Sequence, residues 1–190
     1  RLAERLGTEA SLLVDLGCGS GASTAALLRH VRDARVVGID ASAGMLAQAQ
    51  SKQWPAGVEF HHLPAQRLAE LDLAPVDGVM AAYLLRNLNG SDRDRVLATI
   101  LDGLRPGGWL VLQEYSVAGR RRAGLVWTLV CWLVVIPLSW LVRGSPRLYR
   151  YLWRSVRDFD STAALHDRLG RAGFTGVEQL AVTGWQRGIL

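Results

Sequence analysis

Three glycines at alternate positions, Gly17, Gly19 and Gly21, are the feature of this sequence whose chemical use is clearest. They follow an apolar run, Leu12–Leu16, and lead into residues 22–31, which predict a helix. A strand that turns through glycines into a helix lets the backbone approach a ligand closely and offers N–H donors at the positive end of the helix dipole. The pattern therefore predicts a nucleotide cradle.

Two carboxylates flank this cradle and bear on which cofactor it holds. Asp15 stands just ahead of the glycines, and Asp40 ends the next predicted strand, where a bound cofactor would present its ribose hydroxyls. The same letters satisfy the dinucleotide fingerprint, with Gly17, Gly19 and Ala22 at its three small-residue places. The motif alone leaves a nicotinamide or flavin cofactor and S-adenosylmethionine (SAM) both open. Asp15 and the rest of the chain favour SAM, since this arrangement resembles the first motif of class I SAM-dependent methyltransferases.

The elements that must position these residues alternate between strands and helices. Strands are predicted at Leu12–Leu16, Arg35–Asp40, Val58–His62, Val76–Ala82 and Trp109–Tyr115, with closing strands near Gly176–Val182 and Trp185–Leu190. Helices are predicted at Arg1–Leu6, Ala22–Val31, Ala43–Gln50, 91–104 and Thr162–Ala172. Ser42 is expected to cap the helix at 43–50, and a Ser91–Asp94 capping box the helix at 91–104. The alternation indicates an α/β fold with a doubly wound, mostly parallel sheet, formed by residues 1–190 as one domain.

A basic and apolar insertion, residues 120–157, follows the fifth predicted strand. From Tyr115 to Arg157 the chain has eight arginines and no Asp or Glu, so this segment carries +8 in a chain of net charge +5. Within it, Leu125–Val142 has eighteen residues without a charge, which meets the length criterion for a membrane span. Basic residues beside apolar ones suit an anionic membrane surface better than nucleic acid.

A single membrane span is nevertheless not the structure expected for Leu125–Val142. Predicted strands precede and follow it, so a span would put parts of one sheet on opposite sides of a bilayer. Basic residues at both flanks likewise favour having both ends on the same side. We therefore expect an interfacial or re-entrant element bent at Pro137, with a lid over the active site and a true span as the alternatives.

Composition excludes several other kinds of site. Cys18 and Cys131 lie far apart and predict neither a disulfide framework nor a metal site, which favours a reducing compartment. No spacing of His, Cys, Asp and Glu predicts a metal site, and no Ser–His–Asp or Cys–His arrangement predicts nucleophilic catalysis. No signal peptide is expected ahead of the first strand. The sequence therefore predicts a cytoplasmic protein, peripheral on the inner face of a membrane, and makes no prediction of its oligomeric state.

Motifs beyond the glycine turn resemble the UbiE/COQ5 family of quinone-biosynthesis methyltransferases. The similarity covers most of residues 11–183, and it is carried by Leu85–Leu88, Leu104–Ser116, Tyr149–Val156, Phe159 and Ala172–Phe174. The resemblance implies a seven-stranded Rossmann-like sheet, SAM as the cofactor, and C-methylation of the ring of a demethylmenaquinol or ubiquinol precursor. A polyprenyl quinol stays in the bilayer, so the insertion would bring the SAM site to the membrane surface.

The resemblance also implies which residues form the site. SAM would contact Asp15, Gly17, Cys18, Gly19, Gly21, Asp40, Ala41, Ala65 and Gln66. Among these, Asp40 would accept the two ribose hydroxyls and Asp15 would lie near the amino-acid end of SAM. Arg86 and Asn87, after the fourth predicted strand, would be the catalytic residues and would hold the phenolate oxygen of the acceptor or a water molecule.

Two departures from the family pattern leave alternatives open. Leu63–Gln66 stands where the family often has Gly-Asp-Ala-Glu, so the carboxylate that would face the adenine amino group is missing. Gln113 replaces an expected apolar residue. One alternative is a methyltransferase of the same build that acts on another lipid, a sterol or a hydrophobic phenol. The other is a non-catalytic, membrane-associated protein that binds SAM.

Overall fold

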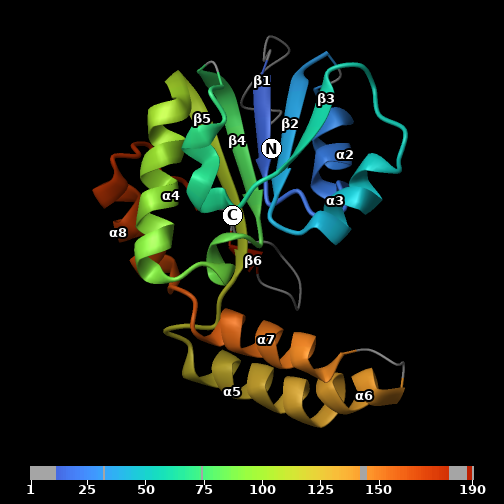
Figure 1. Cartoon of the computed structure of the whole chain (residues 1–190). Coiled ribbons are helices and arrows are strands. Elements are labelled where there is room, and N and C mark those ends of the chain that lie inside the picture. The colour runs from blue at the N-terminus through green and yellow to red at the C-terminus, as the bar shows by residue number, and fades with distance from the viewer. Residues whose placement is uncertain (1–11, 32, 74, 142–144, 180–187, 190) are drawn as a thin grey trace.

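The computed structural model describes residues 12–31, 33–73, 75–141, 145–179 and 188–189 (Figure 1). Its sheet has six strands in the order β3-β2-β1-β4-β5-β6, and neighbours pair in parallel except for β6. The strands are β1 (Leu12–Leu16), β2 (Arg35–Asp40), β3 (Val58–His62), β4 (Val76–Ala82), β5 (Leu104–Tyr115) and β6 (Gly188–Ile189). The strand order reverses between β1 and β4, the point at which doubly wound sheets bind ligands beyond the carboxyl ends of their strands.

Helices cover both faces of this sheet. They are α2 (Ala22–Leu28), α3 (Ala43–Gln50), α4 (Gly90–Gly103) and α8 (Thr162–Ala172), with short 3-10 turns η1 (Ala65–Glu70) and η2 (Leu85–Asn87). In Figure 1, α2 and α3 lie to the right of the sheet and α4 and α8 to the left. The predicted α/β, Rossmann-like arrangement is confirmed.

Side chains along β1 alternate between two buried cores. Leu12, Val14 and Leu16 belong to a cluster with α4, α8 and η1, whereas Leu13 packs with Leu27 of α2. Successive side chains of a strand point to opposite faces, so a strand covered on both faces is apolar nearly throughout. This explains why β1 reads as a continuous apolar run broken by a single acid.

Most predicted elements have the bounds that the sequence indicates. The agreement covers β1 to β4, α3 and α8, and Ser42 caps α3 by accepting a hydrogen bond from the Met45 N–H. The helix predicted over 22–31 ends earlier, at Leu28, and the strand predicted from Trp109 begins at Leu104. The turns η1 and η2 were not predicted, because each is a short 3-10 helix without a helical repeat of apolar residues.

The predicted capping box of α4 is wrong. The cap is Asn89, whose side-chain oxygen accepts a hydrogen bond from the Asp92 N–H at 2.8 Å. Ser91 lies inside the helix and donates to the same Asn89 oxygen. Asn caps a helix as well as Ser does, so the helix could begin after Asn89 or after Ser91. In the structure it begins after Asn89.

Seven strands are not confirmed. Residues 176–179 of the strand predicted near 176–182 are not extended in a sheet, and residues 180–182 lie outside the described ranges. Of the strand predicted at 185–190, Gly188–Ile189 pair antiparallel with β5 as β6, and the remainder lies outside the described ranges. The helix predicted at Arg1–Leu6 also falls there.

The insertion is helical, and we call it the α5–α7 insertion. It consists of α5 (Arg121–Val130), a π-type turn η3 (Cys131–Val135), α6 (Ile136–Leu141) and α7 (Pro146–Arg157), and it lies below the sheet in Figure 1. The π-type turn ends two residues before Pro137, where the missing N–H would interrupt an α-helical ladder. Helix α7 was not predicted. By length and composition alone, residues 121–140 form one helix that could cross a membrane, with a mean hydropathy of 1.9.

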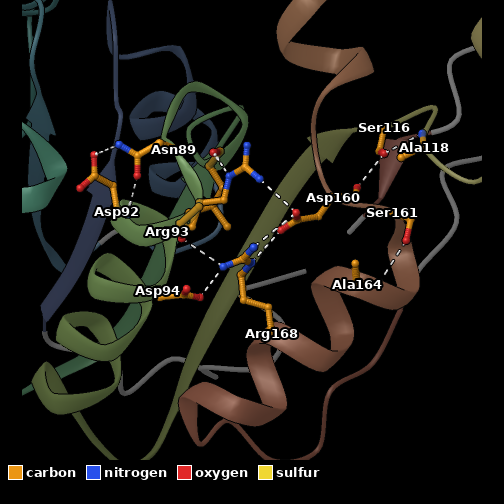
Figure 2. A network of polar contacts seen from close by, with 12 residues as sticks. Asn89, Asp92, Arg93, Asp94, Ser116, Ala118, Asp160, Ser161, Ala164 and Arg168 are labelled. Atoms are coloured by element: carbon orange, nitrogen blue, oxygen red, sulfur yellow. Dashed lines mark hydrogen bonds and ion pairs between the residues drawn. The ribbon is translucent and has the colours of Figure 1, made fainter.

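A polar network fixes the point where the insertion rejoins the sheet (Figure 2). Asp160, between α7 and α8, accepts hydrogen bonds from Arg93 at 3.0 Å and from Arg168 at 2.7 Å. Its backbone carbonyl accepts a hydrogen bond from the Ser116 hydroxyl, just beyond β5. Phe159 beside it is buried beneath the Arg93 guanidinium. The carboxyl end of α7 is therefore held against α4, α8 and the end of β5.

Candidate functional site

A cavity of about 340 Å³ lies at the carboxyl ends of β1, β2 and β4. Its volume falls in the range of small-molecule sites. Six residues that the sequence assigned to the cofactor or to catalysis line it: Gly17, Asp40, Ala41, Ala65, Gln66 and Asn87. Apolar neighbours complete the wall, among them Leu16, Ile39 and Leu84. The cavity thus joins five of the nine predicted cofactor residues to one of the two predicted catalytic residues. The predicted residues outside its lining are Asp15, Cys18, Gly19, Gly21 and Arg86.

The glycine turn adopts a backbone that other residues rarely take. Gly17, Gly19 and Gly21 have φ of 80°, 54° and 81°. A Cβ at Gly21 would lie 2.7 Å from the Trp54 ring, and one at Gly17 would lie 3.2 Å from Leu84. Conformation and space therefore both require glycine here. The contact of Trp54 with Gly21 was not predicted, because Trp54 belongs to a loop 33 residues further along the chain.

Asp40 ties β2 to the glycine turn while facing the cavity. One carboxylate oxygen accepts the Gly19 N–H at 2.8 Å and the other accepts the Ser42 N–H at 2.7 Å. Each oxygen of an ionised carboxylate can accept a further hydrogen bond. Asp40 can therefore hold the turn and still accept two hydroxyl groups from a ligand.

Asp15 is a buried carboxylate with one unsatisfied oxygen. Its Oδ2 accepts hydrogen bonds from Ser23 at 2.7 Å and Thr24 at 2.6 Å, whereas its Oδ1 has no partner within the described part of the chain. Burial raises the pKa of Asp15 above its usual range. A buried carboxylate with a vacant acceptor is stabilised by a cationic donor. Ser23 and Thr24 were missed by sequence reasoning, although their place in the first turn of α2 brings them back over β1.

Cys18 differs from the other residues of the turn because its side chain faces the protein interior. The thiol is buried, and its sulfur lies 3.1 Å from where a Cβ on Gly38 would stand. Burial raises the pKa of Cys18 to about 12, so the thiol stays protonated and unreactive. Any contribution of Cys18 to a ligand would have to come from its backbone.

Gln66 occupies the side of the cavity where the family's carboxylate is missing. Its amide nitrogen donates to Asp92 Oδ2 at 3.2 Å, and Asp92 also accepts from Asn89. Because the nitrogen is engaged, the amide oxygen of Gln66 is the group left to accept a hydrogen bond from a ligand. Gln66 can thus serve as the acceptor for an amino group that a carboxylate would otherwise serve.

The turn η2 separates the two predicted catalytic residues. Asn87 lines the cavity, donates to the Tyr83 carbonyl at 2.9 Å, and accepts a hydrogen bond from the Tyr151 hydroxyl of α7 at 3.1 Å. Arg86 instead reaches the insertion and β5. Its Nη1 donates to Ser155 at 2.8 Å, and its Nε lies 3.6 Å from Glu114.

The side chain of Glu114, on β5, contacts the turn η2. It is fully buried, and one oxygen accepts the Leu85 N–H at 2.6 Å. Burial raises its pKa to about 7, against the lowering effect of Arg86. The carboxyl group therefore changes charge close to neutral pH. The contact that the structure shows for Glu114 is therefore a structural one, with the backbone of η2.

The motifs that carry the family resemblance converge at this point. Tyr151 and Ser155 belong to the Tyr149–Val156 segment, and they contact the Arg86–Asn87 pair from 64 and 69 positions away in the chain. The sequence placed each motif separately but assigned no partner to α7. The contact could not be foreseen because α7 was not predicted as a helix.

Comparison with known proteins identifies the family. Residues 13–108 match a family model described as a methyltransferase domain. Demethylmenaquinone methyltransferase of Thermus thermophilus is 33% identical over 164 residues, covering 86% of this chain and 74% of that protein. This chain belongs to the UbiE/COQ5-like SAM-dependent methyltransferases. The corresponding enzyme of Thermobifida fusca is 30% identical and covers 87% of the chain and 70% of that protein.

Solved structures of other methyltransferases share the fold. Human N-acetylserotonin methyltransferase in complex with SAM superposes with a TM-score of 0.69, at 18% identity over 95% of this chain and 46% of that one. The methyltransferase SibL gives 0.66 at 22% identity, over 99% of this chain and 51% of that one. The chain thus spans about half the length of these two structures. These structures show the shared fold, and the family match with the relatives shows a SAM-dependent methyltransferase.

The residues present fit SAM. The molecule carries a ribose diol, for which Asp40 lines the cavity with two acceptor oxygens. It also carries an ammonium group, for which buried Asp15, just outside the cavity lining, has an oxygen without a partner among the described residues. Gly17 lines the cavity without a side chain, which lets the backbone approach a ligand closely. No group of three or more His, Cys, Asp or Glu side chains placed to hold a metal occurs within the described ranges.

Proposed function

We propose that this methyltransferase C-methylates the ring of a polyprenyl quinol precursor, of the demethylmenaquinol or ubiquinol-precursor type, at a membrane surface. The observation that carries the proposal is the contact between Asn87 and Tyr151. It joins a residue of the cofactor cavity directly to the apolar insertion. The names of the relatives, which act on demethylmenaquinone, support the ring acceptor.

In this proposal the chain's own groups bind and orient SAM. Asp40 accepts the ribose hydroxyls, Asp15 accepts the ammonium group directly or through water, and Gln66 accepts the adenine amino group beside Ala65. Gly17 to Gly21, with Cys18 through its backbone, and Ala41 contact the remainder. When bound, SAM would supply an electrophilic methyl group: the ring carbon would bond to it with an electron pair of the phenolate, the electrons of the methyl–sulfur bond would stay on sulfur, and the ring hydrogen would leave as a proton to solvent.

Asn87 and Arg86 have different tasks in the acceptor half of the site. A hydroquinone carbon becomes nucleophilic as its ring hydroxyl loses a proton, so the developing oxyanion needs a stabilised position. Asn87, in the cavity, would hold that oxygen or a water beside it. Arg86 lies outside the cavity lining, next to Glu114. The charge of Arg86 is least compensated when Glu114 is protonated, and the Glu114 pKa of about 7 allows this near neutral pH. Arg86 would then favour the phenolate by its field and position η2.

The α5–α7 insertion presents an apolar surface that supports membrane contact. Eight large apolar side chains on α5, η3 and α6 are exposed: Leu125, Val126, Leu129, Trp132, Leu133, Val134, Leu138 and Trp140. The opposite side is tied to α7, where Trp153 donates to Thr128 and accepts a hydrogen bond from Trp127. A group of eight exposed large apolar side chains is typical of an interaction or membrane site, and the arginines of α7 add attraction to anionic lipid. We place the protein peripherally, on the cytoplasmic face of a membrane.

An acceptor panel tests the proposal. Purified protein with SAM is offered demethylmenaquinol, a ubiquinol precursor, a sterol and a simple hydrophobic phenol in vesicles, and products are identified by mass. We expect a gain of one methyl group on a quinol alone. Methylation of the sterol or phenol in preference to both quinols would replace this acceptor with another lipid, and SAM binding without any product would contradict the proposal.

A further inference from the structure

Tyr83 occupies an unfavourable backbone conformation at the edge of the cavity. Among the non-glycine residues that the structure describes, it alone has a positive φ, of 58°. It follows β4 directly and lines the cavity together with Asn87. Such a conformation is costly for a bulky residue, and it persists where the surroundings fix it, often at functional sites.

Two neighbours on β5 hold Tyr83 in place. Its backbone N–H donates to the Gln113 carbonyl at 2.7 Å. Its ring stacks on Tyr115, with centroids 4.8 Å apart and planes inclined at 27°. The central carbon of the Arg86 guanidinium lies 5.6 Å from the centroid of the Tyr83 ring, so the ring also contacts η2.

The Tyr83 hydroxyl has a defined remaining capacity for hydrogen bonding. It accepts a hydrogen bond from the Gln113 amide at 2.8 Å and donates to the Tyr115 oxygen at 3.0 Å. A phenol offers one donor and two acceptor positions, so one acceptor position remains. Burial, followed by the Tyr115 hydrogen bond, raises the pKa of Tyr83 to about 12, and the group stays a neutral hydroxyl at physiological pH.

The side-chain amide of Gln113 orients the Tyr83 hydroxyl. Gln113 stands where the resemblance expects an apolar residue, and its amide contacts the Tyr83 hydroxyl. An amide at a half-buried strand position needs a polar partner, and it orients that partner in return. The chain therefore departs from the family pattern at the residue that fixes the direction of the Tyr83 hydroxyl.

We propose that Tyr83 is a specificity-determining residue that accepts a hydrogen bond from a hydroxyl on the aromatic ring of the methyl acceptor. Gln113 and Tyr115 are its positioning residues. This inference rests on the proposed function, because it takes a hydroxylated aromatic ring to lie beside Asn87. A hydroquinone has two ring oxygens, of which one would ionise beside Asn87 while the other donates to Tyr83. The site would thereby prefer a dihydroxylated ring to a monohydroxylated one.

A binding experiment without turnover tests this preference. The full chain with S-adenosylhomocysteine is titrated calorimetrically with 1,4-dihydroxynaphthalene, kept reduced, and with 1-naphthol. We expect wild type to bind the diol about tenfold more tightly, the value of one net hydrogen bond. Tyr83→Phe, and Tyr83→Phe combined with Gln113→Leu, should remove the preference and bring the two affinities to within about twofold of each other. The double variant leaves no amide without its partner.

Matched outcomes separate this inference from the proposed function. Tyr149→Phe, a tyrosine change on α7, should keep the tenfold preference. Equal affinity of wild type for the two probes, no measurable affinity for either, or an unchanged preference in Tyr83→Phe would overturn the inference. Methyl transfer to the diol is then assayed with SAM. Preference without transfer would contradict the proposed function alone, and transfer without preference would contradict the inference alone.

Discussion

The Tyr151 hydroxyl of α7 donates a hydrogen bond of 3.1 Å to the side-chain oxygen of Asn87, which lines the cofactor cavity. A second contact, from Arg86 to Ser155, runs parallel to it one helical turn further along α7. The same helix is fixed at its carboxyl end by Asp160 and at its side by the tryptophans of the insertion. The insertion is therefore attached to the catalytic turn by named side chains as well as by the chain.

Removing that contact should affect chemistry more than cofactor binding. Tyr151→Phe leaves Asn87 without one orienting partner, at a cost of about 1 kcal/mol. We expect kcat on a tailed quinol to fall about fivefold, with the Kd for SAM unchanged. Steady-state assays and calorimetry measure the two quantities. Tyr149→Phe is the control on the same helix, and an equal fall in both variants would assign the effect to α7 in general.

Cofactor binding should depend on Asp40. Asp40→Ala removes the acceptor of the Gly19 and Ser42 N–H groups together with the proposed ribose contact. We expect the Kd for SAM to rise at least a hundredfold, equivalent to about 3 kcal/mol. Asp72→Ala, at an exposed position, should leave the Kd as it is. A Kd within threefold of wild type in Asp40→Ala would remove Asp40 from the site.

Glu114 should make the folded protein less stable as pH rises toward neutrality. Its pKa is about 7 in the folded state and 4.5 ordinarily, so between these values the native state holds a proton that the unfolded chain has released. The stability contribution is complete below pH 4.5 and is lost as pH rises to 7, by about 3 kcal/mol. Urea titrations across this window should show that slope in wild type.

Glu114→Gln should flatten the slope, because the substituted side chain has no proton to lose. Glu59→Gln, a change at a half-buried side chain on β3 that pairs with Arg35, provides the comparison and should retain the slope. A slope in Glu114→Gln equal to that of wild type would mean that Glu114 ionises normally. The overall stability of Glu114→Gln is a separate matter, since Arg86 loses its charged neighbour.

Membrane binding should depend on the exposed arginines of α7. Arg147→Gln with Arg154→Gln removes two exposed charges from α7, the helix that packs on the apolar α5, and each arginine near an anionic surface contributes about 1 kcal/mol. We expect partitioning to phosphatidylserine vesicles to weaken about thirtyfold, and to weaken further with added salt. Arg29→Gln with Arg171→Gln changes the net charge equally at exposed sites elsewhere. Similar losses in both double variants would indicate a net-charge effect without a docking face.

Local sequence signals were sufficient for most of the sheet. Continuous apolar runs such as Leu12–Leu16 and Arg35–Asp40 predict central parallel strands because both faces are covered, and the structure gives those same bounds. The glycine spacing located the turn, and Asp40 at the end of β2 was placed on the cavity. These features depend on neighbours close in the chain or on strand direction alone.

The remainder depends on partners distant in the chain. Arg86 and Asn87 were placed correctly at the end of β4, but only packing against α7 separates the two, one toward the cavity and one toward Ser155. Trp54 at Gly21 and Gln113 at Tyr83 are side-chain contacts between separate elements, which no local pattern reports. Helix α7 escaped prediction because its apolar residues are interrupted by four arginines.

The position of the transferred methyl group tests the central claim most directly. Wild type is incubated with SAM carrying a ¹³C methyl group and with demethylmenaquinol in anionic vesicles, and the product is examined by NMR. A methyl group on the ring carbon, with one S-adenosylhomocysteine released for each, is the predicted result. A methyl group on a ring oxygen, or S-adenosylhomocysteine formed with no labelled quinol, would contradict the account.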